Sequence, residues 1–152
     1  MNELSILQLQ ISAAKAEIRV CEDLNRQYGL TLTEADITEL VELRGQALRS
    51  TGRVEFGGGI LPKLIRAFCS SPYIDRYTYA STLGELQDAF YYFKSDSGDR
   101  FSDDELIGFM ERVFNGQAHG STEVLTTISL EELCRWARNG FSGGFADEEG
   151  FI

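Results

Sequence analysis

The sequence predicts an all-α fold, a single irregular bundle of about six or seven helices, on three observations. Apolar residues recur every three or four positions in most segments of the 152-residue chain, which is the spacing of one helix face. Serine or threonine precedes several of these segments at the position of an N-cap. Glycine follows several of them directly, where it can end a helix in the left-handed conformation.

The first helix is expected from Ile11 to Tyr28, with Gly29 as its end. Residues 7–11 alternate as a strand would, but the apolar stripe through this region has helical spacing and favours a helix. Such a stripe also suits a dimer seam. Packing inside the same domain is favoured, because the flanking positions lack complementary charges. The stripe comprises Leu4, Leu7, Ile11, Ala14, Ile18 and Cys21.

The second and third helices flank a glycine-rich segment. The second is capped by a capping box over residues 31–34 or by Thr33 alone, and it ends at Gly52. The third covers residues 60–68, where Pro62 is tolerated because it lies in the first turn. The expected inward-facing side chains are Ile37, Leu40, Val41, Ala47 and Leu48, then Ile60, Leu61, Leu64, Ile65 and Phe68.

A fourth helix is expected over residues 78–94, the most aromatic part of the chain. Tyrosine buries its ring and keeps its hydroxyl near water, at the margin of a core or in an interface. The helical spacing favours the core margin. The inward-facing residues are Leu83, Leu86, Phe90 and Phe93, and the tyrosines are Tyr73, Tyr77, Tyr79, Tyr91 and Tyr92.

Three serines predict the remaining helices. Ser102 opens a helix to residue 115 through a capping box with Glu105, Ser121 caps a short helix, and Ser129 opens the last one. The pattern therefore indicates one domain over residues 10–140. An extension of residues 1–9 precedes it, and a mobile acidic tail of residues 141–152 follows it.

Charge and cysteine usage exclude several classes of partner. The net charge is −10, and residues 77–152 carry 14 acidic but only 5 basic side chains, so nucleic acid and anionic membranes are poor partners. No apolar run approaches the roughly 20 residues of a membrane span. The odd number of widely spaced cysteines predicts buried thiols in a reducing cytoplasm; they are Cys21, Cys69 and Cys134.

Residues 52–69 hold the candidate ligand site. Three consecutive glycines before a helix can turn backbone amides toward an anion, flanking cations would add charge, and Glu55 would be the general base if the protein is an enzyme. The alternative, a purely structural turn, is favoured because the segment lacks the lysine-serine ending of a P-loop. The tentative binding residues are Arg53, Glu55, Gly57, Gly58, Gly59 and Lys63.

Two further patterns are weaker. The acidic residues between 96 and 105 do not have the spacing of a calcium loop, and the preference of carboxylates for a helix N-terminus explains them; they are Asp96, Asp99, Asp103, Asp104 and Glu105. His119 is the only histidine, which excludes metal sites that need several histidines. We expect neither a metal nor a cofactor.

Several short motifs in combination resemble an uncharacterised Firmicutes family, a domain of unknown function. The resemblance covers roughly residues 10–140 and implies a single domain of bacterial, cytoplasmic origin, with no activity to carry over. Its motifs are YGLTLT (28–33), GRVEFGGG (52–59), SPYI (71–74), FYYFK (90–94), SDDEL (102–106) and ARN (137–139).

Two functions therefore remain open. The first is a non-enzymatic protein-interaction or scaffold domain, with a protein partner or self-association, indicated by the concentration of tyrosines and the absence of a convincing catalytic set. The second is a small-anion or phosphate site, either for binding alone or for catalysis, built on Gly57–Gly59 at a helix N-terminus.

Overall fold

The computed structural model describes residues 3–55 and 59–139, with side chains described from residue 8 onward. Every regular element in these ranges is an α-helix, so the predicted all-α fold is confirmed. The predicted tail, residues 141–152, lies outside them, as do Gly57 and Gly58. The helices are α1 (Glu3–Arg19), α2 (Glu22–Gln27), α3 (Glu34–Thr51), α4 (Leu61–Phe68), α5 (Tyr79–Asp96), α6 (Asp103–Asn115), α7 (Thr122–Thr127) and α8 (Leu130–Asn139).

The first predicted helix is divided into α1 and α2. The ladder of hydrogen bonds breaks between them, because the Cys21 N–H donates to the carbonyl of Ile18, only three residues back, at 3.0 Å. The end of α2 is the predicted one: Gly29 has a φ of 71°. The Leu30 N–H then donates to the carbonyl of Asn25 at 2.9 Å, which is the bond of a Schellman cap.

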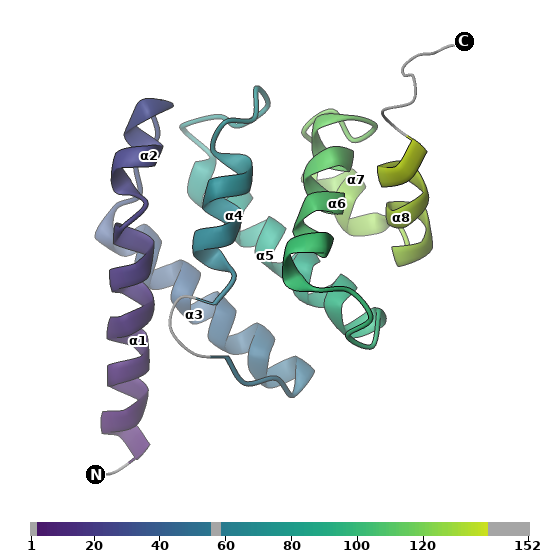
Figure 1. The fold of residues 1–152 in the computed structure, drawn as a ribbon. Coiled ribbons are helices and arrows are strands. Elements are labelled where there is room, and N and C mark those ends of the chain that lie inside the picture. Colours follow the sequence, from purple (N-terminus) through teal and green to yellow (C-terminus); the bar gives the residue numbers. More distant parts are fainter. Residues whose placement is uncertain (1–2, 56–58, 140–152) are drawn as a thin grey trace.

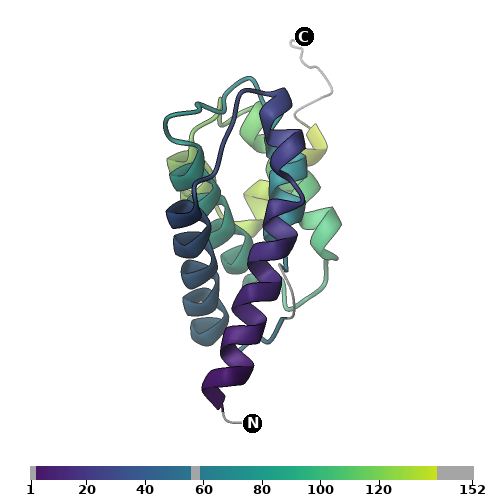
Figure 2. The same cartoon turned by 90° about the vertical axis from the view of Figure 1, so that its left-hand side faces the viewer.

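The helices form two layers. Figure 1 shows α1 with α2, α4 and α6 standing side by side, while α3 and α5 lie behind them. In the view of Figure 2, α1 and α3 lie next to each other, one from each layer. α7 packs on α5 and α8 packs on α6. The core therefore lies between the two layers.

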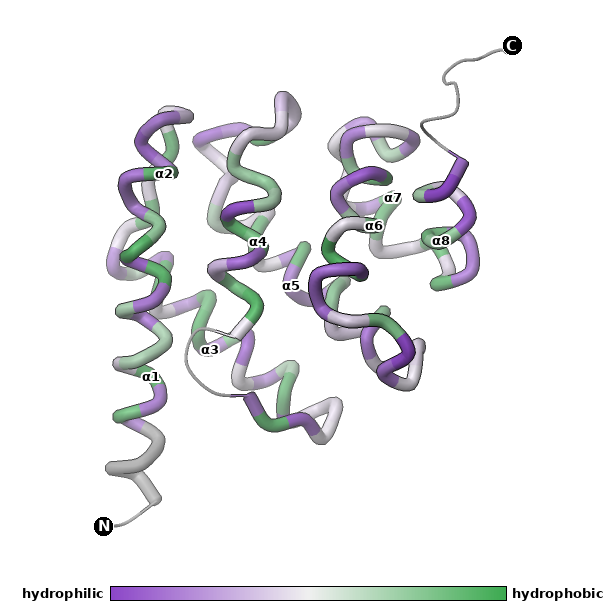
Figure 3. The backbone as a smooth tube through the Cα atoms, viewed as in Figure 1, coloured by the Kyte–Doolittle hydropathy of each residue, from purple (hydrophilic) through white to green (hydrophobic). Residues whose placement is uncertain are grey.

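The short helix α4 is the centre of this core, packed against α1, α5 and α6. Green and purple segments alternate along the helices in Figure 3, as expected for amphipathic helices that bury one face. The Phe68 ring of α4 meets Phe114 of α6 edge to face, with ring centroids 5.3 Å apart. The side chains predicted to face inward from the fourth helix are all fully buried, namely Leu83, Leu86, Phe90 and Phe93.

Two tyrosines lie deeper than the core margin that their spacing predicts. Tyr79 and Tyr91 are each only 1% exposed, and each hydroxyl has a protein partner, as a buried phenol requires. The Tyr79 hydroxyl donates to Asn25 Oδ1 at 2.7 Å, which ties α5 to α2. Burial raises the pKa of Tyr79 well above its usual value. Tyr73, Tyr77 and Tyr92 remain exposed.

The helix ends follow the capping rules, with one change of partner. Thr33 caps α3: its hydroxyl accepts from the Asp36 N–H at 3.0 Å, and the Asp36 carboxylate accepts from the Thr33 N–H at 2.9 Å. The box therefore uses Asp36 rather than the span 31–34. The predicted box of Ser102 and Glu105 is present at the start of α6, and Gly52 ends α3 with a φ of 69°.

The cysteines are buried free thiols, as predicted. Burial raises the pKa of the Cys21 and Cys69 thiols, so neither has the character of a reactive thiolate. Within the two described ranges, none of the helices combines the length and the apolar character that a membrane span requires.

Candidate functional site

The described part of the glycine segment is tightly packed. Gly59 has a φ of 57°, and a β-carbon added there would lie 2.7 Å from Nε of Arg44 and would also overlap the carboxylate of Glu55. Only glycine fits this position without a shift, because the φ and the close approach both exclude a side chain. Gly59 therefore brings the loop close to α3.

Glu55, the candidate general base, is part of an internal network. Its Oε1 atom accepts a hydrogen bond from the Tyr91 hydroxyl at 2.7 Å and lies 3.4 Å from Nη2 of Arg44. Arg44 is only 6% exposed. Burial and the neighbouring Glu55 carboxylate raise the pKa of Tyr91 far above its usual range. The network fastens the segment after α3 to both α3 and α5.

The cations proposed for an anion site pair with carboxylates instead. Arg53 Nη2 lies 2.7 Å from Oδ1 of Asp99, and Lys63 Nζ lies 2.8 Å from Oδ1 of Asp104. The basic residues beside the glycines thus form ion pairs with carboxylates from the acidic stretch 96–105. The described residues hold no group of three or more acidic, histidine or cysteine side chains arranged to bind a metal ion.

His119 lies in an exposed loop against an aromatic ring. Its ring meets Tyr73 edge to face with centroids 6.3 Å apart, and Nδ1 lies 3.4 Å from the Tyr73 hydroxyl. The adjoining Gly120, with a φ of 79°, also packs against Tyr73. These contacts give His119 a role in shaping the loop.

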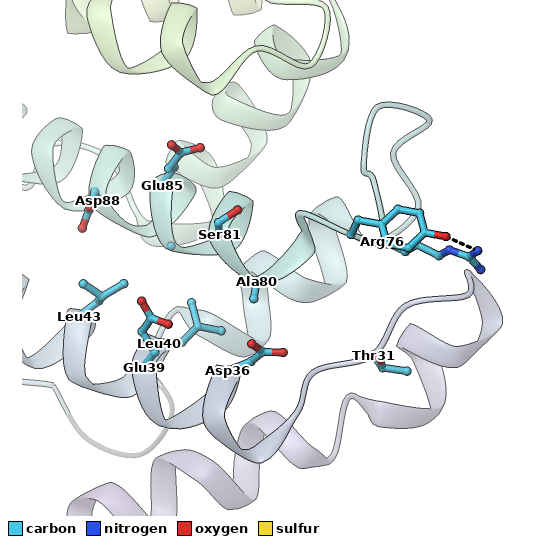
Figure 4. A pocket seen from close by; sticks show the side chains of 12 residues that line it. Thr31, Asp36, Glu39, Leu40, Leu43, Arg76, Ala80, Ser81, Glu85 and Asp88 are labelled. Carbon is cyan, nitrogen blue, oxygen red and sulfur yellow. Dashed lines mark hydrogen bonds between the residues drawn. The ribbon is translucent and has the colours of Figure 1, made fainter.

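Sequence reasoning did not predict a groove that lies between α3 and α5. It encloses about 440 Å³ and is acidic at its sides and apolar at its floor. Figure 4 shows Glu39 of α3 directed toward α5 and Asp88 of α5 directed toward α3, beside Leu43. We call this the α3–α5 groove; it is lined chiefly by Asp36, Glu39, Leu40 and Leu43 of α3 and by Ala80, Gly84, Glu85 and Asp88 of α5.

The groove continues along both helices into a second hollow of about 480 Å³, because Leu43 and Asp88 line both. This second part is less charged. Its further lining residues are Gln46, Ala47, Ser50 and Thr51 of α3 and Tyr91 and Tyr92 of α5. The early residues of both helices line one end and the late residues line the other, so α3 and α5 run in the same direction.

The carboxylates of the groove differ in how they are satisfied. Asp36 accepts the capping bond described above, and Glu85 accepts a hydrogen bond from the Thr122 hydroxyl at 2.6 Å. Within the described residues, neither Glu39 nor Asp88 forms an ion pair. Partial burial, together with the charge of Glu85, raises the pKa of Asp88.

One cation lies at the end of the groove, but it is turned toward an aromatic ring. The guanidinium of Arg76 lies 4.8 Å from the centroid of the Tyr77 ring and donates to its hydroxyl at 2.7 Å. Figure 4 places Arg76 beyond Ala80, away from Asp88. Glu39 and Asp88 therefore lie on opposite sides of the groove, and the described residues that line it place no cation beside either carboxylate.

One signal in the sequence indicates the groove in retrospect. Leu43 is apolar but lies off the predicted inward stripe of its helix, and the small residues Ala80 and Gly84 lie one turn apart on α5. A β-carbon at Gly84 would lie 3.3 Å from Cδ1 of Leu43. The small residues thus let the two helices approach and leave a hollow beside Leu43.

Comparisons with known proteins give a family but no activity. The model of a family of unknown function, DUF6323, matches residues 17–143 of the chain. No curated protein and no solved structure matches it.

Proposed function

Because the chain belongs to DUF6323, a family of unknown function, we propose its role from the geometry: a non-enzymatic protein-interaction domain that binds a positively charged segment of a partner protein in the α3–α5 groove. One observation carries this proposal. Glu39 and Asp88 flank an apolar floor from opposite helices, and neither has an ion-pair partner in the described residues. A lysine or arginine placed between them would satisfy both.

The electrostatics of the groove favour a cationic partner. Partial burial raises the pKa of Asp88 because it disfavours the charged carboxylate, and repulsion from the nearby charge of Glu85 adds to this rise. A cation entering the groove relieves this repulsion, and the apolar floor adds a hydrophobic contribution. The net charge of −10 also speeds the approach of a basic partner over long range.

The same charges argue against other partners at this surface. A second copy of the chain would bring an equally acidic groove toward the first, and nucleic acid would bring phosphates. The self-association that the tyrosines suggested is therefore less favoured here than a different, basic protein. The buried free thiols support a reducing cytoplasm as the location that we propose.

The anion-binding alternative receives less support. Arg53 and Lys63 would have to leave Asp99 and Asp104 to contact a ligand, and Glu55 is held by Tyr91. The glycine segment is better explained as a close-packed turn, with Gly59 as its tightest described point.

The test is binding of a labelled cationic peptide to variants of the groove. A fluorescein-labelled oligolysine of about ten residues serves as the probe, followed by anisotropy at low and physiological salt. We expect E39Q/D88N to weaken binding at least about fivefold, because it removes the two facing charges. The control E17Q/E131Q removes the same net charge from exposed positions on α1 and α8 and is expected to weaken binding less than about twofold.

Equal losses in the two double variants would contradict the proposal, since they would show attraction to the overall charge rather than to the groove. An oligoglutamate peptide of the same length is the negative control for the probe.

A further inference from the structure

Building on the proposed function, we infer that the segment bound in the α3–α5 groove is an amphipathic α-helix, with one apolar stripe flanked on both sides by lysine or arginine. The charge of the groove alone does not decide the conformation of the partner segment or the order of its apolar and basic residues. Three properties of the groove carry the inference: its length, its walls and the placement of its charges.

The length suits several turns of helix. The lining residues of α3 extend from Asp36 to Thr51, and at 1.5 Å per residue this span is about 22 Å. A helix of about 15 residues, or roughly four turns, fills such a length. The lining of α5, from Ala80 to Tyr92, covers nearly the same distance beside it.

The walls favour a partner that satisfies its own backbone. Both walls are helices, whose main-chain groups are already hydrogen-bonded to each other, so they offer no edge for an added strand. A peptide lying on the apolar floor must therefore pair its own N–H and C=O groups, which an α-helix does. A polyproline ligand would need a row of aromatic rings, but the exposed Tyr77 and Tyr92 lie at opposite ends.

The floor is shaped for the apolar face of a third helix. Leu43 and Ala47, both partly buried, are four apart on α3, and Ala80 and Gly84 are four apart on α5. Rows with these spacings form the ridges and grooves into which side chains of another helix pack. A bound helix would thus lie on the solvent-facing side of α3 and α5 and pack against both.

The charges lie on both sides of this floor. Glu39 is on the α3 side, and Glu85 and Asp88 are on the α5 side. A partner helix with lysine or arginine on only one flank would leave the other row of carboxylates without a cation. The second part of the groove has Gln46, Ser50 and Thr51 on the α3 side instead, so we place the basic residues of the partner along the half that includes Glu39.

The experiment compares two peptides of identical composition. One is a labelled peptide of about 15 leucine and lysine residues whose leucines follow helical spacing, and the other has the same residues in alternating, strand-like order. We expect the helical peptide to bind at least about tenfold more tightly, and to gain helical circular dichroism in the complex. The same gain is expected to disappear with E39Q/D88N.

A second variant tests the floor. L43N replaces an apolar lining side chain that is only partly buried, and V54N makes the same kind of change at a position that is 78% exposed. We expect L43N, but not V54N, to reduce the preference for the helical peptide, with thermal unfolding of both variants confirming that they fold.

The outcomes separate the two proposals. Equal binding of both peptides, still weakened by E39Q/D88N, would overturn the helical partner and leave the cationic groove standing. No binding of either peptide would overturn both. Displacement of the peptides by spermine, with no gain of helicity, would identify the ligand as a small polycation and overturn the helix.

Discussion

The ammonium group of Lys63 lies 2.8 Å from the carboxylate of Asp104, a residue 41 positions further along the chain. Lys63 lies in the first turn of α4 and Asp104 in the first turn of α6, so the pair joins the N-terminal ends of two neighbouring helices. The cation that the sequence offered to a bound anion thus meets a carboxylate of its own chain. Similar pairs join Arg53 to Asp99 and Lys94 to Asp103.

This pairing predicts that phosphate does not stabilise the protein. Thermal unfolding of the parent and of K63A is expected to be unchanged by millimolar phosphate, because a ligand raises the free energy of unfolding only if it binds the folded state. K63A itself is expected to cost less than about 1 kcal/mol, as is usual for an exposed pair. A phosphate-dependent rise in the parent that is lost in K63A would restore the anion-binding alternative.

Removing Glu55 should be far more costly than removing a surface carboxylate. E55A takes away the acceptor of the Tyr91 hydroxyl and the anion facing the buried Arg44, so we expect a loss of about 2–3 kcal/mol in urea unfolding. E42A, at an exposed position of α3, is the control, with an expected change within about 0.5 kcal/mol. Equal effects of the two substitutions would contradict the network.

Gly59 and Gly52 form a matched pair for measuring close packing. Both have positive φ, 57° and 69°, but a β-carbon at Gly52 meets nothing within 4 Å, whereas one at Gly59 meets Arg44 and Glu55. G52A is expected to cost about 1 kcal/mol from backbone strain alone. G59A is expected to cost at least about 1 kcal/mol more, because the neighbouring side chains must also move. Equal losses of unfolding free energy for G52A and G59A in urea would show that Arg44 and Glu55 move aside at little cost.

The raised pKa of Asp88 predicts a dependence of stability on pH. A carboxyl whose pKa is higher in the folded state binds more protons there, so folding stability falls as pH rises from the unfolded pKa through the folded one. D88N removes this loss. We expect D88N to be more stable than the parent at pH 7, and the difference to vanish below the ordinary pKa of aspartate, near 3.9.

Urea unfolding of the parent and of D88N, at pH 7 and at a pH below about 3.9, measures this difference. A D88N protein less stable than the parent at pH 7 would show that Asp88 makes a favourable contact rather than a repulsive one.

Features that depend on residues close in sequence could be predicted. The capping box of Ser102 and Glu105 joins residues only three positions apart, and the stop at Gly52 requires only its own φ. These signals act through local backbone geometry, so a linear sequence contains them. The cap at Thr33 was one of the two predicted alternatives, and its partner Asp36 follows the same rule, three residues after the cap.

Features that depend on contacts between distant segments could not be predicted from the sequence. Arg53 and Asp99 are 46 residues apart, and nothing in their local sequence indicates that they meet. The groove likewise exists only because Leu43 of α3 lies against Gly84 of α5. Helical spacing identifies the face of a helix that is apolar, but it does not tell which neighbour covers it or where coverage ends.

The hydrogen bond from the Tyr79 hydroxyl to Asn25 fixes the short helix α2 to α5. α2 has six residues, too few to persist as a helix in water without tertiary contacts. Its Asn25 is nevertheless 2% exposed and fixed by a phenol from the middle of the chain. We therefore expect the amide proton of Asn25, which donates to the carbonyl of Cys21, to exchange more slowly than the amide protons at the exposed positions of α2 and to report the separation of α2 from α5.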